Sequence, residues 1–318
     1  MTLETRPSSN YEAWHDVHTR WDSVAEFAAS GPWVDGVHSI DLGEGPSLDL
    51  LFVGQPHTSG TVIPVFFNGA VAARETKTGP FFSGSRLADK GGFGFIAVSD
   101  PSLGLDLSLG LAWYAGNRYS KVQDQITAVL ASIAAKTGQE LLFIGGSGGG
   151  FASLYYGGRL ETVASAVVWN PQTEIHKYNP AFVENYMKHA WDGEENCTAQ
   201  TSVVGSLPKR LVYMQNASDW HVSGHTQPFL EAAHFTHRGR GVYVEDSAVV
   251  CFASYGDGHA PLPEGPLMAL IHQLLDQRTT ASQAVDAMLA RHATSWSTPD
   301  WSHPQLTTLG QMEVPVIS

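Results

Sequence analysis

The 318-residue sequence is poor in charge, and poorest in positive charge. It holds 18 Lys and Arg against 31 Asp and Glu, which gives a formal net charge of −13. Proteins that bind phosphate backbones or anionic membrane surfaces gather Lys and Arg, so we expect no nucleic-acid partner. Charged residues make up only 15% of the chain and hydrophobic residues 43%, a composition that favours a large folded core over disorder.

Long apolar runs and cysteines are scarce as well. No segment approaches the roughly 18 consecutive apolar residues that a membrane-spanning helix needs. The two cysteines, Cys197 and Cys251, are too few for a disulfide framework and lack metal-ligand spacing. The first residues lack the basic-then-apolar pattern of a secretory signal. We therefore expect a cytoplasmic protein without a membrane span.

Short apolar segments alternate with helical ones along most of the chain. Residues 121–136 have the apolar spacing of a helix, which Gly138 ends. Strands that are apolar on both faces and alternate with helices predict an α/β fold, with a mainly parallel sheet covered on both faces. The expected strands are 36–42, 47–53, 61–67, 93–98, 141–144, 164–169, 211–214 and 248–255, and further helices are expected at 23–29, 266–277 and 280–292.

The expected organisation is one core with additions. Residues 1–46 are expected to form an N-terminal extension, 47–277 the core, and 278–318 a C-terminal helix and tail. Residues from about 174 to 206 interrupt the alternation, and we interpret them as a cap over the carboxyl edge of the sheet. The alternative is a long surface excursion. The aromatic and apolar residues that suggest a cap are Tyr178, Phe182, Tyr186, Met187 and Trp191.

A glycine-rich segment, Gly145 to Gly149, has the pattern G-x-S-x-G with Ser147 at its centre. It follows an apolar strand directly and precedes a segment that can begin a helix, which is the context of a nucleophile elbow. Side chains two positions on either side of the serine would clash there, so Gly145 and Gly149 are physically required. A linker would lie in polar surroundings. A phosphate-binding turn is the sharper rival, but no Lys-Ser or Lys-Thr follows.

A serine nucleophile needs a base and an acid that orients it, in the chain order Ser, acid, His. Asp219 follows the strand at 211–214, and His259 follows the strand at 248–255. The carboxyl ends of neighbouring parallel strands meet at one edge of a sheet, so both side chains are expected beside Ser147. The competing residues are His221 and His225 for the base, and Asp257 for the acid.

The remaining site predictions concern the oxyanion and the substrate. We expect the N–H of Gly148 and an N–H of the loop after 61–67 to hold the oxyanion, with Ala70 favoured over Gly69. Aromatic side chains near strand ends are candidates for stacking on substrate, although ordinary packing explains them equally well. The candidate substrate-binding residues are Asn68, Trp113, Trp169 and Trp220.

Together, the elbow, Asp219, Gly258-His259 and the Asn68-Gly69 turn resemble the α/β-hydrolase superfamily over roughly residues 47 to 277. The resemblance implies a mainly parallel eight-stranded sheet, no metal or other cofactor, and serine acyl-enzyme chemistry. This sequence has Asn68-Gly69 where many members have His-Gly. The stretch around Trp113 to Gly116, with the elbow, also resembles hydrolase-like proteins of bacterial glycan export and capsule acetylation.

The sequence thus predicts a serine hydrolase that cleaves a small-molecule carboxylic ester, with Ser147 as nucleophile, His259 as base and Asp219 as orienting acid. Two alternatives stay open. The same triad serves an O-acyltransferase if a sugar hydroxyl replaces water, which would make the substrate a carbohydrate ester. A catalytically silent binding protein with the hydrolase fold is the other alternative.

Overall fold

The computed structural model describes residues 7–58, 60–301, 309 and 312–318. The expectation about a secretory signal concerns the first residues, and residues 1–6 lie outside the described residues. No helix in the described ranges is long and apolar enough to cross a membrane.

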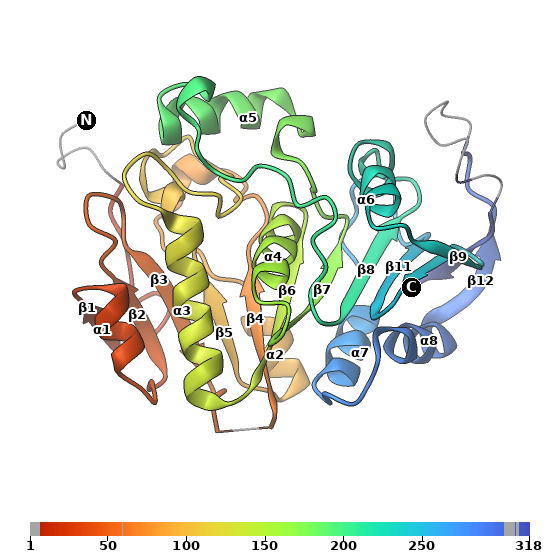
Figure 1. The fold of residues 1–318 in the computed structure, drawn as a ribbon, viewed down its shortest axis with the longest axis horizontal. Helices are drawn as coiled ribbons and strands as arrows, with labels where there is room; N and C mark the ends of the chain where they lie inside the picture. Colours follow the sequence, from red (N-terminus) through yellow and green to blue (C-terminus); the bar gives the residue numbers. More distant parts are fainter. Residues whose placement is uncertain (1–6, 59, 302–308, 310–311) are drawn as a thin grey trace.

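A single large sheet runs through the described part of the chain (Figure 1). It has eleven strands in the order β1-β2-β3-β5-β4-β6-β7-β8-β11-β10-β9. The strands are β1 (His18–Trp21), β2 (Gly36–Ile40), β3 (Leu48–Val53), β4 (Val62–Phe67), β5 (Phe95–Val98), β6 (Glu140–Gly146), β7 (Ala164–Trp169), β8 (Leu211–Asn216), β9 (Thr236–Gly239), β10 (Val242–Glu245) and β11 (Ala248–Ala253).

The run from β5 through β4, β6, β7 and β8 to β11 is parallel throughout. This arrangement, with the elbow between β6 and the next helix, confirms the α/β-hydrolase fold. The sheet exceeds the eight strands that the resemblance implied, because β1, β9 and β10 extend its edges. Within the described residues 7–46, β1 and β2 pair in this sheet, so this part of the expected extension adds strands to the core.

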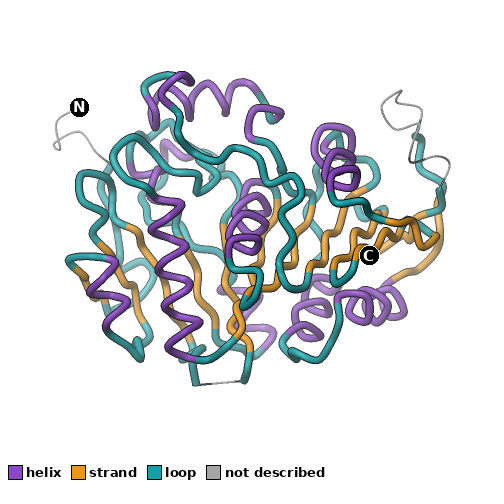
Figure 2. The backbone as a smooth tube through the Cα atoms, viewed as in Figure 1, coloured by secondary structure: helices purple, strands orange, loops and turns teal. Residues whose placement is uncertain are grey.

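Helices cover both faces of the sheet (Figure 2). One apolar cluster includes residues of α1 (Val24–Ala29), α3 (Val122–Thr137), α4 (Gly148–Arg159) and α6 (Gln227–Ala232). The opposite cluster includes residues of α2 (Ser85–Gly91), α7 (Glu264–Leu274) and α8 (Ala281–His292). Strand β4 shows why both faces need cover, because Val65 joins the first cluster and Phe66 the second.

The C-terminal region is part of the same body. Helix α8 contacts β8 and β11, and β12 (Ala293–Ser297) pairs with β13 (Val314–Ile317) in a small antiparallel sheet. The α8 helix begins at a capping box in which Thr280 and Gln283 satisfy each other's backbone N–H groups. In the described part of 278–318, helix α8 and the paired strands β12 and β13 therefore pack against the core.

Short helical turns connect these elements at the edges of the sheet. Most of the segment from 174 to 206 consists of α5 (Pro180–Tyr186) and such turns, and it lies beyond the carboxyl ends of the strands (Figure 1). The turns are η2 (Arg74–Thr76), η3 (Pro101–Gly104), η4 (Ile175–Lys177), η5 (Met187–Trp191), η6 (Glu194–Asn196) and η7 (Val222–Thr226).

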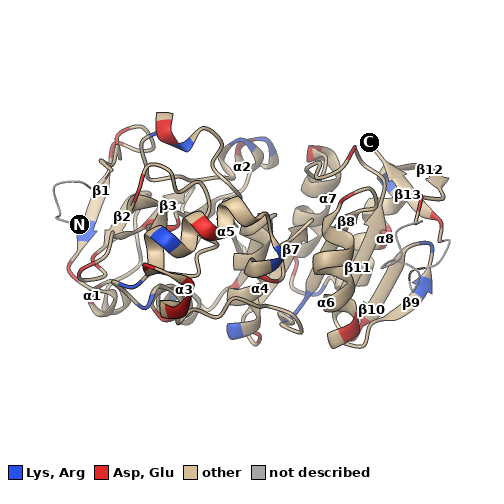
Figure 3. Cartoon of the chain, turned by 90° about the horizontal axis from the view of Figure 1, so that it is seen from above, with Lys and Arg blue, Asp and Glu red and all other residues tan. Residues whose placement is uncertain are grey.

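Charged residues are scattered over the described ribbon, with Lys and Arg interspersed among Asp and Glu (Figure 3). Several of the cations are paired with carboxylates, among them Arg210 with Glu140 and Arg238 with Asp286. The expectation of no nucleic-acid partner stays a prediction.

A buried carboxyl group in β3 makes the stability of the fold depend on pH. Asp49 accepts hydrogen bonds from Ser39 and Ser47, and burial raises its pKa to about 7 against the opposing effect of these bonds. The folded pKa lies above the unfolded value. The contribution of Asp49 to the stability of the fold is therefore present in acid, and it is lost as the pH rises from about 4 through about 7.

We expect Asp49→Asn to be more stable than the wild type at pH 8 and to lose this advantage at pH 4, with a difference on the order of 4 kcal/mol. Denaturant unfolding of both proteins at pH 4 and pH 8 measures this difference in the free energy of unfolding. Asp41→Asn, at an exposed aspartate just after β2, is the control. Parallel curves of unfolding free energy against pH for Asp49→Asn and the wild type would show that Asp49 does not titrate in this range.

Candidate active site

Ser147 lies at the turn between β6 and α4, with φ 54° and ψ −122°. The glycines around it are needed because the strand and helix approach closely. A Cβ on Gly145 would lie 2.3 Å from Gly149 O, and a Cβ on Gly149 would lie 2.4 Å from Phe67 O. The strained φ and the two close approaches are the local features of a nucleophile elbow, which presents the serine Oγ above the sheet.

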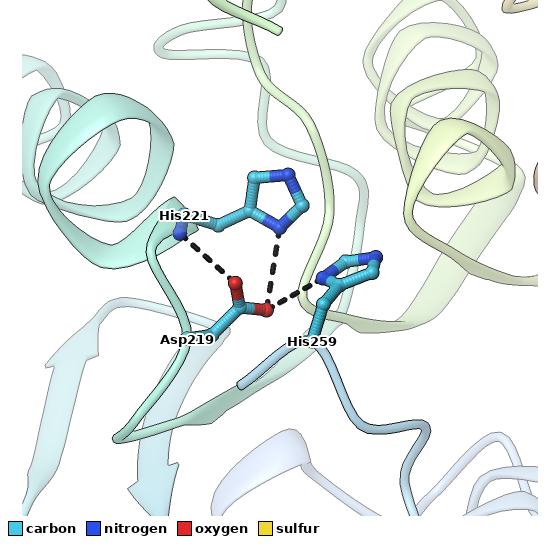
Figure 4. A group of neighbouring side chains, drawn as sticks. All are labelled: Asp219, His221 and His259. Carbon is cyan, nitrogen blue, oxygen red and sulfur yellow. Dashed lines mark hydrogen bonds and ion pairs between the residues drawn. The ribbon is translucent and has the colours of Figure 1, made fainter. Parts of the chain in front are cut away.

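Asp219 and His259 come from loops after β8 and β11 and are joined by a hydrogen bond (Figure 4). His259 Nδ1 lies 2.7 Å from Asp219 Oδ2, and the Asp219 side chain is fully buried. Burial pushes the pKa of Asp219 up, but hydrogen bonds from His221 and His259 outweigh it and hold the pKa at about 2. The ionised carboxylate requires a proton on His259 Nδ1, which leaves Nε2 as an acceptor.

His221 and His225, the competing bases, are fully buried. His221 Nδ1 lies 3.3 Å from Asp219 Oδ2, and the backbone N–H of His221 donates to Asp219 Oδ1 at 3.0 Å. Burial lowers the pKa of His221, while its hydrogen bond with Asp219 opposes the shift. His225 Nδ1 accepts from Thr173 N–H, and burial lowers the pKa of His225 to about 3. Asp257, the competing acid, is exposed.

Ser147 and His259 line one cavity of about 980 Å³, in which neither His221 nor His225 takes part. No hydrogen bond joins Ser147 Oγ to His259 among the described residues. Catalytic hydrogen bonds are often loose before substrate binds. Of the three histidines near Asp219, His259 alone reaches the space where a substrate could meet the serine.

The loop after β4 borders the nucleophile. A Cβ on Gly69 would lie 3.7 Å from Ser147 Cβ. Asn68 N–H donates to the Tyr114 hydroxyl at 2.7 Å, and Val71 N–H donates to Gly110 O at 2.7 Å. Within the described ranges, the N–H groups of Gly69, Ala70 and Gly148 have no partner. These amides are the available donors for an oxyanion, and the choice between Gly69 and Ala70 stays a prediction.

Two of the four predicted substrate contacts line the cavity, namely Asn68 and Trp169. Trp113 is fully buried because its loop turns into the core, where positive φ angles at Trp113 and Tyr114 let Asp100 accept the Tyr114 N–H. Trp220 is half exposed and stacks on Tyr178, outside the cavity. We therefore expect no direct substrate contact from Trp113 or Trp220.

The segment from 174 to 206 does not line this cavity. It packs on the loop that precedes α3, where Tyr186 donates to Gly116 O and Arg118 N–H donates to Ala190 O. The walls beside Ser147 come instead from 66–87 and from 259–267. The segment expected to cap the substrate entrance therefore forms no wall of this cavity, and its Tyr186 and Trp191 are buried in packing.

Sequence reasoning missed Gln172, which lies three residues beyond the end of β7. Its Nε2 donates to Ser147 Oγ at 2.8 Å, and its side chain is fully buried. The available signal was weak: a single amide side chain just past the strand adjacent to the nucleophile strand. Neither the G-x-S-x-G pattern nor the chain order of a triad points to it.

Asp219, His221 and His259 also form a group whose potential metal-ligand atoms lie within 4.8 Å of one another. Both Nδ1 atoms face the same carboxylate oxygen, Asp219 Oδ2, at hydrogen-bond distance. A proton on each Nδ1 accounts for this geometry. The arrangement therefore suits a hydrogen-bonded acid and base, and the absence of a metal stays an expectation.

Comparisons with solved structures agree on the fold and are distant in sequence. Dipeptidyl peptidase 4 of Porphyromonas gingivalis is 15% identical, with a TM-score of 0.50 over 80% of this chain and 36% of that one. A puromycin hydrolase is 14% identical, with a TM-score of 0.50 over 81% and 41%. The capsule O-acetyltransferase of Neisseria meningitidis serogroup A is 14% identical, with a TM-score of 0.49 over 73% and 90%.

The match spans less than half the length of the first two proteins. No family model matches the sequence, and no curated protein matches it. At this identity the likenesses show the α/β-hydrolase fold alone.

Proposed function

We propose that the protein is a serine hydrolase that cleaves a carboxylic ester through an acyl-enzyme on Ser147. The observation that carries this proposal is the shared cavity of Ser147 and His259, with His259 bonded to the buried, ionised Asp219. Nucleophile, base and orienting acid occur in the chain order of this fold.

In the proposed reaction, Ser147 Oγ attacks the ester carbonyl carbon while His259 Nε2 accepts the hydroxyl proton. The N–H groups of Gly148 and Ala70 hold the oxyanion, and each stabilises it by about 3 kcal/mol. His259 passes the proton to the departing alkoxide, which leaves as an alcohol. Water then attacks the acyl-enzyme, His259 accepts a water proton and returns it to Ser147 Oγ, and a carboxylic acid is released.

The cavity walls favour an ester with a bulky apolar half. Trp14, Phe66, Phe82 and Leu262 contribute to them, and the indole N–H of Trp14 is already used on Pro80 O. Among the charged residues at the cavity, Arg86 and Glu264 are paired with each other, and Lys77 also lines it. A sugar would need many polar partners, so these walls support ester hydrolysis over transfer to a sugar hydroxyl.

A panel of p-nitrophenyl esters tests the substrate class. We expect kcat/KM to rise from the acetate to the hexanoate and benzoate, because apolar surface of the larger groups is buried at about 25 cal/mol per Å². Trp14→Ala should lower kcat/KM for the benzoate by roughly tenfold and spare the acetate. Phe182→Ala, at a half-buried phenylalanine outside the cavity, is the matched control.

Three results would contradict this choice of substrate. A flat profile across the panel would remove the apolar preference. Faster acyl transfer to added sugars than to water would favour the acyltransferase. Absence of turnover and of labelling by a fluorophosphonate probe would favour a silent binding protein.

A further inference from the structure

Gln172 holds the nucleophile at two points. Its backbone N–H donates to Ser147 O at 3.2 Å, and its side-chain Nε2 donates to Ser147 Oγ at 2.8 Å. Among the described residues, Gln172 is the hydrogen-bond partner of Ser147 Oγ. A buried amide that contacts the reacting oxygen of the proposed hydrolase is placed to act on the chemistry.

The orientation of this amide is set by Trp113. Trp113 Nε1–H donates to Gln172 Oε1, and an indole nitrogen can only donate. The amide oxygen must therefore face Trp113, which turns the NH₂ group toward Ser147. Both side chains are fully buried, so no bulk water competes for these bonds.

The loop that carries Gln172 is fixed on both sides. The Asn170 side chain accepts from Asn216 N–H at 2.7 Å and donates to Ala260 O at 2.7 Å. Thr173 donates its N–H to His225 Nδ1 and its hydroxyl to His225 O. The buried His225, which the proposed reaction does not use, thus has a role in anchoring this loop. The amide is held in place before substrate binds.

We propose that Gln172 is a further catalytic residue, which fixes the direction of the proton on Ser147, and that Trp113 is its positioning residue. This inference rests on the proposed function. Because Ser147 Oγ accepts from Gln172, its own hydrogen is free to point to His259 Nε2. At the other end, Asp219 fixes the His259 tautomer that can accept it. In this series of hydrogen bonds from Trp113 to Asp219, each side chain then donates to the next.

The same N–H acts again when the acyl-enzyme breaks down. Ser147 Oγ is then the leaving group: the bond from the acyl carbon to Oγ breaks, and Oγ takes the electron pair. His259 supplies the proton that Oγ needs. A buried N–H that already points at Oγ stabilises the negative charge developing there until the proton arrives.

Three variants test the proposal by their rates of labelling with a fluorophosphonate probe and of ester turnover. Gln172→Met keeps the shape and removes the donor, and we expect a loss of about 10²-fold. Gln172→Glu places a carboxylate that accepts the Ser147 proton away from His259, and we expect a larger loss at pH 8. Trp113→Phe lets the amide turn, and we expect a smaller loss than Gln172→Met.

The pH profile separates this role from a structural one. The rate of Gln172→Glu relative to the wild type should rise as the pH falls, because a protonated carboxyl group regains a donor. The corresponding ratio for Gln172→Met should stay constant. Gln215→Met, at another fully buried glutamine away from the cavity, controls for loss of a buried amide.

The proposal is overturned if Gln172→Met labels and turns over within about threefold of the wild type, or if the Gln172→Glu ratio does not change with pH. If a Gln172 variant fails to fold, Trp113→Phe still decides, because an unchanged rate in that variant contradicts the proposal. A wild type that the probe does not label contradicts the proposed function itself. Labelling of Ser147 with unchanged Gln172 variants contradicts this inference alone.

Discussion

Ser147→Ala lowers kcat for ester hydrolysis by about 10⁶-fold in our expectation, and it removes labelling by a fluorophosphonate probe. No acyl-enzyme can form without Oγ, and members of a triad act as a unit. The substitution removes one oxygen atom and leaves the backbone, with its φ of 54°, unchanged in length and connectivity, so the fold should survive. Turnover of the preferred p-nitrophenyl ester measures the loss, and thermal unfolding checks the fold.

Ser153→Ala is the matched control for this substitution. Ser153 lies six residues further along, in α4, and is fully buried, with its hydroxyl donating to Gly149 O at 2.9 Å. It should keep both labelling and turnover at near the wild-type level. If Ser147→Ala retained labelling, or if Ser153→Ala lost it while folded, the nucleophile would have to be sought elsewhere.

The second large effect is expected at the base. His259→Ala should come within about tenfold of Ser147→Ala, because the serine loses its proton acceptor. His221→Ala should cost far less, since His221 contacts Asp219 but does not line the cavity. His225→Ala should also cost far less, and only through the Thr173 loop that it anchors. Steady-state kcat with a single ester compares the three variants.

These histidine variants control for one another, because all three side chains lie within one cluster around Asp219. Their rings are in contact, with centroids 4.2 Å apart for His221 and His259 and 4.8 Å apart for His221 and His225. A loss in His221→Ala as large as that in His259→Ala would move the base assignment. Measuring unfolding of each variant separates such a loss from simple destabilisation.

Much of the fold could be predicted from the sequence because its central strands are apolar on both faces. Strands such as β4 and β11 are continuous apolar runs, and helix α3 has a clear period ended by Gly138, which has φ 67°. The elbow was predictable for a different reason. Close approach of strand and helix excludes side chains at Gly145 and Gly149, so the motif itself encodes the geometry.

The edge strands could not be predicted because their sequences lack that signal. Strand β9 consists of mostly exposed, polar residues, and β1 is only partly buried. Their pairing is determined by neighbours distant in the sequence, as with β1 on β2. The position of residues 174–206 also depends on neighbours distant in the sequence. Their aromatic content indicated a buried surface, but it did not show whether that surface faces the substrate cavity.

Within the site, the backbone positions were easier to predict than the side-chain directions. Asp219 and His259 follow strand ends, and the order of the strands brings them together. The direction of Trp113 depends on a positive φ, and the contact of Gln172 depends on a turn after β7. Neither feature leaves a pattern in one sequence.

The most direct test of the account is to locate the adduct of a fluorophosphonate probe on the wild-type protein by peptide mass spectrometry. We predict a single phosphonylated residue, Ser147, in the peptide that contains Gly145 to Gly149, and we predict that prior incubation with the preferred ester slows its formation. An adduct on another residue, or active ester turnover with Ser147 unmodified, would contradict the central claim that Ser147 is the nucleophile.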